Sequence, residues 1–382
     1  MTADISSYKD PGKLAAAIVK KIGKKIVLAL PLGLGKACHI ANALVDLALR
    51  DSTIELKILT ALTLEFPRAD SDLARRFLEP ARSRLFGEYP VLTYATLLRN
   101  RQLPDNITVN EFFFLAGSWL SVPAAQQNYI PANYTHVLPL LLAQGVNVIA
   151  QLITRHDDAY SLSCNPDITP DLLKARQVGK CEFVFAGQIN SELPFMYGDA
   201  ELPAEEIDFL LDGPDTDFEL YSVPKRPVSL PAQAVGLRVA SLVQDGGTLQ
   251  IGIGSISDAV TRALILRHTD HRQFQSLCKN LSGEAPRYDT AFEEGLYGVS
   301  EMFVDGFLQL ASAGILKREI DGVVLHGGFF VDCRDFYKKL HAMSEAERAR
   351  FQMKPVSFTN EIYGDEENKR QARKRHALLT AP

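Results

Sequence analysis

Residues 24–36 read KKIVLALPLGLGK and residues 39–49 read HIANALVDLAL, and this stretch decides the fold that the sequence predicts. The first part is a run of apolar residues that ends in glycines, which is typical of a buried strand followed by a turn. The second part carries apolar residues at helical spacing. A strand, a glycine turn and a helix in succession are the repeating unit of α/β proteins, in which helices cover a mostly parallel sheet.

The same alternation continues along the chain. After a helix at 73–86, further strands are expected at NITVNEFFFLAG (106–117), VNVIAQLI (146–153) and KCEFVFAGQIN (180–190), in addition to IELKILTALTLE at 54–65. The pattern restarts with a helix at 232–246, a strand at TLQIGIG (248–254) and a helix at 256–268. Because both halves contain a strand that runs into a glycine turn and a helix, we expect two similar open parallel-sheet α/β domains.

The boundary between the two domains is expected in GPDTDFELYSVPKRPVSLP at 213–231. This segment has four prolines, many turn-forming residues and little periodicity, which is the composition of a linker or crossover. The sequence therefore predicts an N-terminal domain at 1–220 and a C-terminal domain at 221–382.

Composition narrows the classes of function. The 382 residues include 46% hydrophobic and 23% charged residues, as in an ordinary globular protein that is long enough for two domains. The formal net charge of -5 lacks the global basic excess that nucleic-acid binding usually needs, so a small or anionic ligand is expected and nucleic acid is not. The basic run KRQARKRH at 369–376 is interpreted as a solvated helix.

The cysteines and the N-terminus bear on the compartment. The five cysteines are far apart, odd in number and form no C-x-x-C pair, so reduced thiols in a cytoplasm are expected rather than disulfides or zinc ligands. The first residues lack the apolar region of a signal peptide, and no run reaches the roughly 20 apolar residues of a membrane span. His268 and His271 have metal-like spacing, but no nearby cysteine or carboxylate completes a ligand set, so we expect surface histidines and no metal.

Two glycine loops are candidate binding elements. GLGK at 33–36 lacks the first glycine and the Ser/Thr of a phosphate loop, and position 38 is Cys38 where a dinucleotide fingerprint requires glycine. GIGSI at 252–256 fits better, because a helix beginning near Ser257 would point its free N–H groups at an anion or a developing oxyanion. Ser257 and Asp258 also supply ordinary N-capping, so spacing alone leaves both interpretations open.

The stretch GVSEMFVDG at 298–306 contains the most informative carboxylate. Glu301 stands between small residues, and Asp305 follows four positions later, just ahead of an amphipathic run. Glu301 could cap a helix, lie in solvent or react with a substrate, and Asp305 invites the same structural interpretations. Spacing does not decide between them.

Several segments, in the right order, resemble the acetyl-CoA hydrolase/CoA-transferase family, which includes 4-hydroxybutyrate and butyryl-CoA:acetate CoA-transferases. NEFFFLAGSWLSVPAAQQNYIPANYTH (110–136) with VNVIAQLITRHDDAYSLSCNPDIT (146–169) resembles the family's first-domain segment, and AGQINSELPFMYGD (186–199) resembles its Q-x-N-x-x-x-P-x-x-x-G stretch. DGGTLQIGIGSISDAV (245–260) resembles the coenzyme A loop, and YGVSEMFVDGFLQLASAGIL (297–316) resembles the H-[ST]-E-M-x-x-D-G segment that carries a catalytic glutamate.

The resemblance implies a mechanism and site residues. Glu301 would be the nucleophile of a transfer between a short-chain acyl-CoA and a carboxylate, through a glutamyl-CoA thioester. The coenzyme A loop would be Gly252, Ile253, Gly254, Ser255 and Ile256, and the substrate would also meet Gln188 and Asn190. No permanent cofactor is implied, since coenzyme A enters as substrate. Hydrolysis of acetyl-CoA, with water as the acceptor, and a catalytically silent chain remain the alternatives.

The chain also departs from the family pattern. Val299 stands where the family usually has histidine, so one polar neighbour of the site is expected to be missing, and RHTDHRQFQSLCKNLSGEAPRYDT at 267–290 resembles an insertion that forms an extra loop near the site. VSFTNEIYGDEENKRQARKRHA at 356–377 resembles a segment that normally continues into more strands and a G-x-G-G-Q-x-[DN]-F stretch. The second domain is therefore expected to be truncated, with a homo-oligomer or a completing polypeptide as possible partners. Apolar strand runs around Phe112 to Trp119 are interpreted as core packing rather than as an acyl pocket.

Overall fold

The computed structural model describes residues 5–360, and these form two compact units that divide after Ser222. The basic run at 369–376 and most of the segment 356–377 lie outside the described residues. Each unit has its own sheet and core. None of the helices within residues 5–360 has the length and apolar character needed to cross a membrane.

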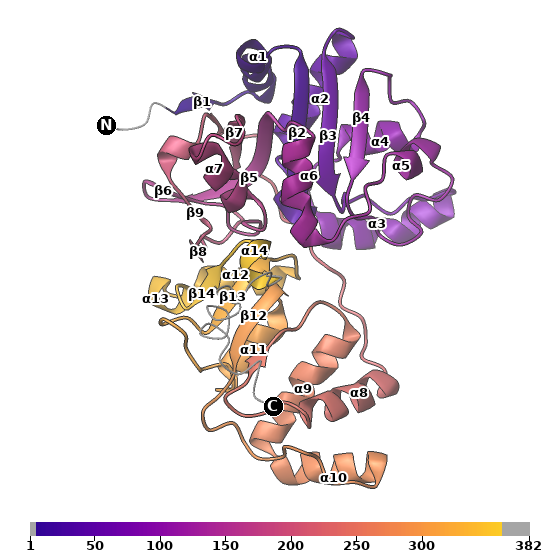
Figure 1. Ribbon diagram of the computed structural model, residues 1–382. Helices are drawn as coiled ribbons and strands as arrows, with labels where there is room; N and C mark the ends of the chain where they lie inside the picture. The colour runs from indigo at the N-terminus through magenta and orange to yellow at the C-terminus, as the bar shows by residue number, and fades with distance from the viewer. Residues whose placement is uncertain (1–4, 361–382) are drawn as a thin grey trace. The chain divides into compact units, whose positions relative to one another are not determined.

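Unit 1 is built on a parallel sheet with the strand order β1-β10-β7-β5-β2-β3-β4. Figure 1 shows β2, β3 and β4 side by side, with helices around them. The strands of this unit are β1 (Ser6–Tyr8), β2 (Lys25–Leu32), β3 (Glu55–Ala61), β4 (Ile107–Glu111), β5 (Val148–His156), β6 (Ala159–Ser161), β7 (Val184–Ile189), β8 (Tyr197–Gly198), β9 (Glu201–Leu202) and β10 (Phe209–Leu211). Its helices are α1 (Pro11–Ile22), η1 (Gly33–Gly35), α2 (Cys38–Arg50), α3 (Asp72–Phe86), α4 (Thr93–Arg99), α5 (Pro123–Gln127), η2 (Tyr134–His136), α6 (Val137–Ala143), α7 (Thr169–Gln177) and η3 (Ala204–Glu206).

Unit 2 contains four parallel strands in the order β11-β12-β13-β14. These are β11 (Thr248–Leu249), β12 (Tyr297–Met302), β13 (Leu325–Phe329) and β14 (Phe351–Met353). The helices are α8 (Leu230–Ala240), α9 (Ser255–Thr269), α10 (His271–Ser282), α11 (Asp305–Ser312), α12 (Arg334–Ala342), α13 (Glu345–Arg348) and α14 (Val356–Thr359). The predicted α/β class with two parallel sheets is confirmed.

Apolar runs explain why the central strands form. In β2 the residues from Ile26 to Leu30 are all buried, as expected for a parallel strand that is covered on both faces. Close packing of helices uses small residues. A Cβ atom at Gly236 in α8 would lie 2.6 Å from the backbone of Ala259 in α9, so this glycine allows the two helices to touch.

Three expectations about elements are wrong in detail. The strand expected at 248–254 ends at Leu249, because the glycines that follow form a loop. The strand expected at 106–117 is limited to Ile107–Glu111, and beyond it the side chains of Phe113 and Leu115 are 50% and 67% exposed, so only part of this apolar run is core.

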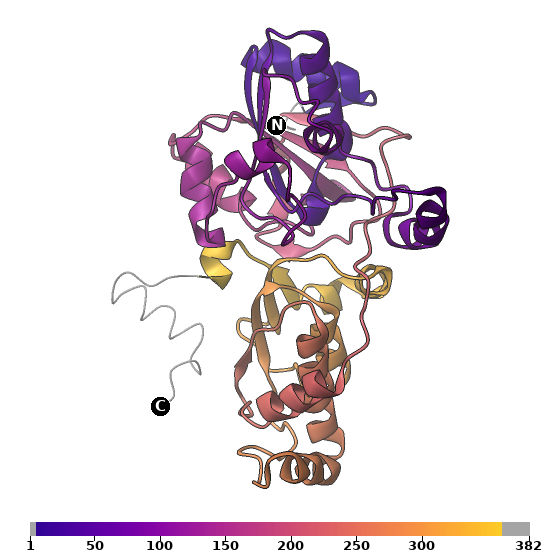
Figure 2. The same ribbon diagram turned by 90° about the vertical axis from the view of Figure 1, so that its right-hand side faces the viewer.

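The third correction concerns the stretch 267–290. It contains the helix α10, whose Phe274 and Cys278 are buried at helical spacing and which packs on α9 and α8. Figures 1 and 2 show α10 at one extremity of unit 2, beyond the carboxyl end of α9. Most of the stretch therefore folds as a helix and not as the extra loop that was expected.

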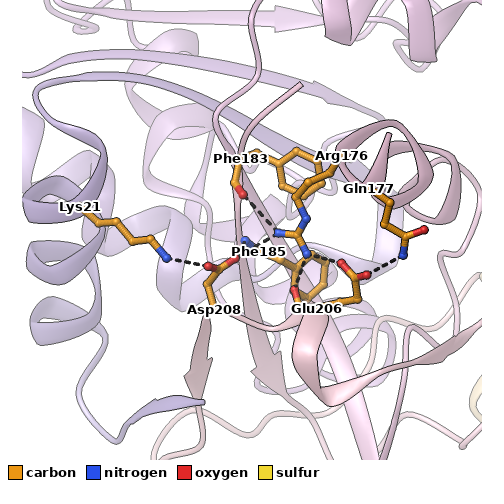
Figure 3. Close-up of polar contacts among 7 residues, drawn as sticks. All are labelled: Lys21, Arg176, Gln177, Phe183, Phe185, Glu206 and Asp208. Carbon is orange, nitrogen blue, oxygen red and sulfur yellow. Dashed lines mark hydrogen bonds and ion pairs between the residues drawn. The ribbon is translucent and has the colours of Figure 1, made fainter. Parts of the chain in front are cut away.

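An ion-pair network joins α7 to the residues that directly precede β10 in unit 1. Figure 3 shows the Arg176 guanidinium between the carboxylates of Glu206 and Asp208. Asp208 also accepts hydrogen bonds from the backbone N–H of Phe185, at 2.9 Å, and from Lys21 Nζ, at 2.6 Å. The network fixes β10 beside β7 by charge-assisted contacts, and Arg176 is more buried in it than Lys21.

Candidate active site

Glu301 lies in β12, near the carboxyl end of this strand, and is half-buried. Its carboxylate accepts a hydrogen bond from Nδ2 of Asn360. Helix α11 begins only at Asp305, with Val304 as its N-cap, so Glu301 does not cap it. The carboxyl ends of parallel strands are where open α/β sheets bind ligands, so the location favours a functional carboxylate.

The glycine loop follows β11, the strand that lies beside the strand of Glu301. The hydroxyl of Ser300 donates a hydrogen bond of 2.9 Å to the carbonyl oxygen of Ile251, just before Gly252. A Cβ atom at Gly252 would lie 3.9 Å from Sδ of Met302, so the loop also lies near the residue that follows Glu301. The two segments that sequence resemblance singled out are therefore neighbours in space.

Helix α9 begins at Ser255, two residues earlier than expected, and its N-cap is Gly254 rather than Ser257 or Asp258. Gly254 has a φ of 122°, a value that residues with a side chain rarely adopt. A glycine has no side chain with which to cap the helix, and the first N–H groups of a helix have no partner within it. The side chains of Ile253 and Ile256 are 50% and 54% exposed, so the first turn of α9 is open to a ligand.

Asp305 does not have the solvated role that the sequence suggested. Its carboxylate is buried, pairs with Lys225 at 3.0 Å and Lys339 at 2.7 Å, and accepts a hydrogen bond of 2.7 Å from Gln309. Burial raises the pKa of Asp305, but the hydrogen bonds from Lys339, Gln309 and Lys225 outweigh it and hold the pKa below its ordinary value. Asp305 thus fixes the start of α11, the helix that follows β12.

The position of Val299 has a polar neighbour. In the parallel pairing of β12 with β13, Val299 lies directly beside His326. The imidazole is buried, and its Nδ1 shares a hydrogen bond with the hydroxyl of Tyr297. The adjacent strand thus places a histidine beside Val299, with its Nδ1 engaged by Tyr297.

Three residues near Glu301 were not singled out from the sequence. Asn360 is 59 positions from the Glu301 carboxylate that it binds. Gly328 in β13 faces Glu301, and a Cβ atom there would lie 2.7 Å from the Glu301 carbonyl oxygen and 3.2 Å from Oγ1 of Thr359. Ser300 is a small residue in a strand. Only the adjacent glycines of HGGFF at 326–330 mark, by themselves, a place where another backbone comes close.

Gln188 and Asn190 belong to unit 1 and are fully buried. The Gln188 amide donates to the carbonyl oxygen of Thr216 at 2.9 Å and lies 2.9 Å from Nδ1 of His39. The Asn190 amide donates to the carbonyl oxygen of Phe218 at 2.9 Å, and its oxygen accepts from the N–H of Glu192 at 3.0 Å. Both side chains hold the chain segment that follows β10.

The GLGK turn and His268, which the sequence favoured less as binding elements, form hydrogen bonds within the protein. In the GLGK turn, Lys36 is fully buried and donates to the carbonyl oxygens of Pro31 and Ala61 at 2.5 and 2.6 Å, and burial lowers its pKa to about 8. Nδ1 of His268 accepts from the N–H of Phe292 at 3.1 Å. Among the described residues, no three His, Cys, Asp or Glu side chains gather as a metal site would require.

No family model matches the chain. Curated proteins match parts of it. A succinyl-CoA:cyclohexane-1-carboxylate CoA transferase of Geobacter metallireducens is 26% identical over 162 residues, or 42% of this chain and 35% of that protein. A 4-hydroxybutyrate coenzyme A transferase of Clostridium kluyveri is 28% identical over 200 residues, or 52% of this chain and 39% of that protein. A succinyl-CoA:acetate/propanoyl-CoA:succinate CoA transferase of Fasciola hepatica is 33% identical over 132 residues, or 34% of this chain and 22% of that protein. The matches thus span less than half the length of these relatives.

Solved structures share the fold over most of the chain. RipA from Yersinia pestis aligns with a TM-score of 0.65 and 17% identity, and the alignment covers 94% of this chain and 70% of RipA. A 4-hydroxybutyrate CoA-transferase from Porphyromonas gingivalis aligns with a TM-score of 0.56 and 18% identity over 93% of this chain and 68% of that one. Parts of the chain are thus similar in sequence to proteins that are named CoA transferases, and most of the chain shares its fold with a solved 4-hydroxybutyrate CoA-transferase.

Proposed function

We propose that this chain transfers coenzyme A between a short-chain acyl-CoA and a carboxylate, with Glu301 as the nucleophile. The observation that supports this most is the hydrogen bond from Ser300 to Ile251, which holds the glycine loop beside the strand end that carries Glu301. A nucleophile and a set of unpartnered N–H donors then lie at one strand end, as acyl transfer requires. The curated relatives are named for transfer to and from carboxylates, which favours transfer over hydrolysis as the proposal.

The reaction can proceed without a metal or a separate base. The Glu301 carboxylate attacks the thioester carbonyl, the carbon–sulfur bond breaks, and coenzyme A leaves as a thiolate while an acyl-glutamyl anhydride forms. The thiolate then attacks the glutamyl carbonyl and expels the acyl group as a carboxylate, which leaves glutamyl-CoA. An acceptor carboxylate reverses the two steps and departs as the new acyl-CoA.

The loop residues have definite parts in this proposal. Each attack creates a tetrahedral oxyanion, and backbone N–H groups of Ser255 and Ile256 at the start of α9 are suitable donors because the helix leaves them without a partner. Gly252 and Gly254 let the backbone approach coenzyme A closely, and Ile253 offers an apolar contact. Coenzyme A is thus a substrate, and no permanently bound cofactor takes part.

Gln188 and Asn190 receive a supporting part in the proposal. Their side-chain amides are engaged with Thr216 and Phe218, so they shape the segment after β10. Substituting them should change stability before it changes substrate preference, because a buried amide without its partner is costly.

An isotope experiment tests the proposal. The full chain is incubated with butyryl-CoA and labelled acetate, and the products are separated by chromatography. Transfer predicts labelled acetyl-CoA from the wild type and none from Glu301→Gln, which has nearly the same shape but is a poor nucleophile. Free coenzyme A without labelled acetyl-CoA would instead indicate hydrolysis, and no product at all would mean that this chain does not catalyse the transfer by itself.

A further inference from the structure

We infer that His326 is a positioning residue for Glu301, acting through the short helix α14. The inference rests on the proposed function of Glu301 and adds a residue that acts on it through other residues. It is argued from four consecutive contacts within unit 2: Tyr297 to His326, His326 to Phe358, α14 to Asn360, and Asn360 to Glu301.

The imidazole of His326 is held in a fixed orientation. Its side chain is buried in β13, with Val299 of β12 on one side and Gln352 of β14 on the other. A buried imidazole is costly unless its nitrogens have partners, and Nδ1 has one in the Tyr297 hydroxyl. This hydrogen bond fixes the plane of the ring.

The face of the imidazole supports Phe358. The two ring centroids are 5.1 Å apart with an interplanar angle of 52°, a favourable tilted arrangement. Phe358 belongs to α14, which has only four residues, of which Val356 is buried. A single helical turn is not stable alone, so its contacts with the sheet determine where it lies.

Helix α14 in turn carries the amide that binds Glu301. The N–H of Asn360 donates to the carbonyl oxygen of Val356 at 2.8 Å, so Asn360 continues the turn and moves with it. Its Nδ2 reaches the Glu301 carboxylate, and Thr359 packs over Gly328 beside the Glu301 backbone. A shift of Phe358 would therefore displace the amide that orients the carboxylate.

Orientation of a nucleophile affects rate more than affinity. A carboxylate that is free to rotate must be brought into line with the thioester in each turnover, whereas the amide hydrogen bond holds it in place beforehand. The binding of coenzyme A through the glycine loop does not involve His326. Loss of the imidazole should therefore lower kcat and leave KM for acyl-CoA nearly unchanged.

Two substitutions at position 326 separate the roles of the ring. His326→Phe keeps an aromatic face against Phe358 but loses the hydrogen bond to Tyr297. His326→Asn keeps a polar group near the hydroxyl but loses the face. Phe358→Leu removes the same contact from the other side, and Phe274→Leu is the stability control, because Phe274 is fully buried in α10 at the far end of unit 2.

The expected results are specific. His326→Asn and Phe358→Leu should each lower kcat by about tenfold or more with KM changed by less than about threefold, and His326→Phe, which keeps an aromatic ring but loses the hydrogen bond that orients it, should lower kcat by a smaller factor. Hydrogen exchange of residues 356–360 should speed up in the first two variants only. Phe274→Leu should lower the unfolding midpoint without altering kcat.

Other results would overturn the inference. A folded His326→Asn or Phe358→Leu with wild-type kcat and unchanged exchange at 356–360 would do so, as would a Phe274→Leu variant that loses as much kcat. If His326→Asn does not fold, Phe358→Leu decides alone. Failure of the proposed function is recognised separately, because Glu301→Gln would then leave the wild-type reaction unchanged, while exchange at 356–360 still reports whether His326 holds α14.

Discussion

At the scale of single residues, two glycines near Glu301 have different tasks. A Cβ atom at Gly328 would lie 2.7 Å from the carbonyl oxygen of Glu301 and 3.4 Å from its Cα, which leaves no room for a side chain. At Gly252 the nearest atom to a new Cβ would be Sδ of Met302, at 3.9 Å, which is an ordinary contact. Gly328 is therefore required by packing, and Gly252 is available for a ligand.

The same substitution at both positions should separate these tasks. Gly328→Ala should lower the free energy of unfolding by about 1 to 3 kcal/mol, because the strand that carries Glu301 must move. Gly252→Ala should change it by less than about 0.5 kcal/mol and raise KM for acyl-CoA, because the methyl group hinders the approach of coenzyme A. Urea unfolding and steady-state kinetics measure both. A Gly328→Ala variant as stable as the wild type would contradict the packing described here.

Asp167 in unit 1 gives a prediction about pH. Burial raises the pKa of Asp167 to about 6, although the hydrogen bond from Tyr134 opposes the shift. Between about pH 4 and 6 the folded chain then keeps a proton that the unfolded chain releases, since an unperturbed aspartate has a pKa of about 3.9. The unfolded state binds fewer protons in this window, so stability falls as pH rises.

Asp167→Asn should remove this dependence. The free energy of unfolding of the variant, minus that of the wild type, should increase by up to about 1.4 kcal/mol per pH unit from pH 4 to 6 and level off above. Urea unfolding at several pH values checks the slope. Equal slopes for the two proteins would show that Asp167 does not titrate in this range.

At the scale of elements, one hydrogen bond joins the glycine loop to β12. Ser300→Ala would leave the buried carbonyl of Ile251 without its partner and should cost about 1 to 3 kcal/mol of stability together with part of kcat. Ser312 in α11 is a matched control, because its hydroxyl donates over the same 2.9 Å to a carbonyl within its own helix. Ser312→Ala should stay within about 0.5 kcal/mol of the wild type and keep full activity. Equal losses of stability and kcat in the two variants would show that the contact between Ser300 and the loop has no special role.

The network around Arg176 offers a second comparison between elements (Figure 3). The side chains of Arg176 and Glu206 are 19% and 12% exposed, whereas Lys21 is 51% exposed. Arg176→Met should therefore cost about 2 to 4 kcal/mol, because it leaves the carboxylates of Glu206 and Asp208 poorly paired. Lys21→Met should cost less than about 1 kcal/mol. Urea unfolding measures both, and similar costs would contradict the difference in burial.

Elements with a strong pattern could be predicted from the sequence, and elements that tertiary contacts decide could not. The apolar run of β2 and the periodic run of α2 are local signals. The end of β11 was misplaced because IGIG alternates like a strand, although its glycines form a loop. Helix α10 was taken for a loop within a polar stretch, although Phe274 and Cys278 at i and i+4 mark its buried face.

At the scale of the whole molecule, the α/β class could be predicted because alternating strand and helix signals run through both halves of the chain. Glu301 and the glycine loop could be proposed as site residues through resemblance, since each lies in a continuous motif. Gly328, Asn360 and His326 could not, because they come near Glu301 only after β12, β13 and α14 pack together. Residues of the candidate site that lie in one continuous segment can thus be predicted from the sequence, and residues that come together only in the folded sheet cannot.

The most direct test of the central claim is a covalent one. The full chain is incubated with acyl-CoA, reduced with borohydride and digested, and the peptide that contains residues 297–302 is examined by mass spectrometry. Reduction of a glutamyl-CoA thioester predicts a modified Glu301 that depends on acyl-CoA and is absent from Glu301→Gln. An active wild type in which Glu301 stays unmodified, or a modification that appears on another residue, would contradict the account.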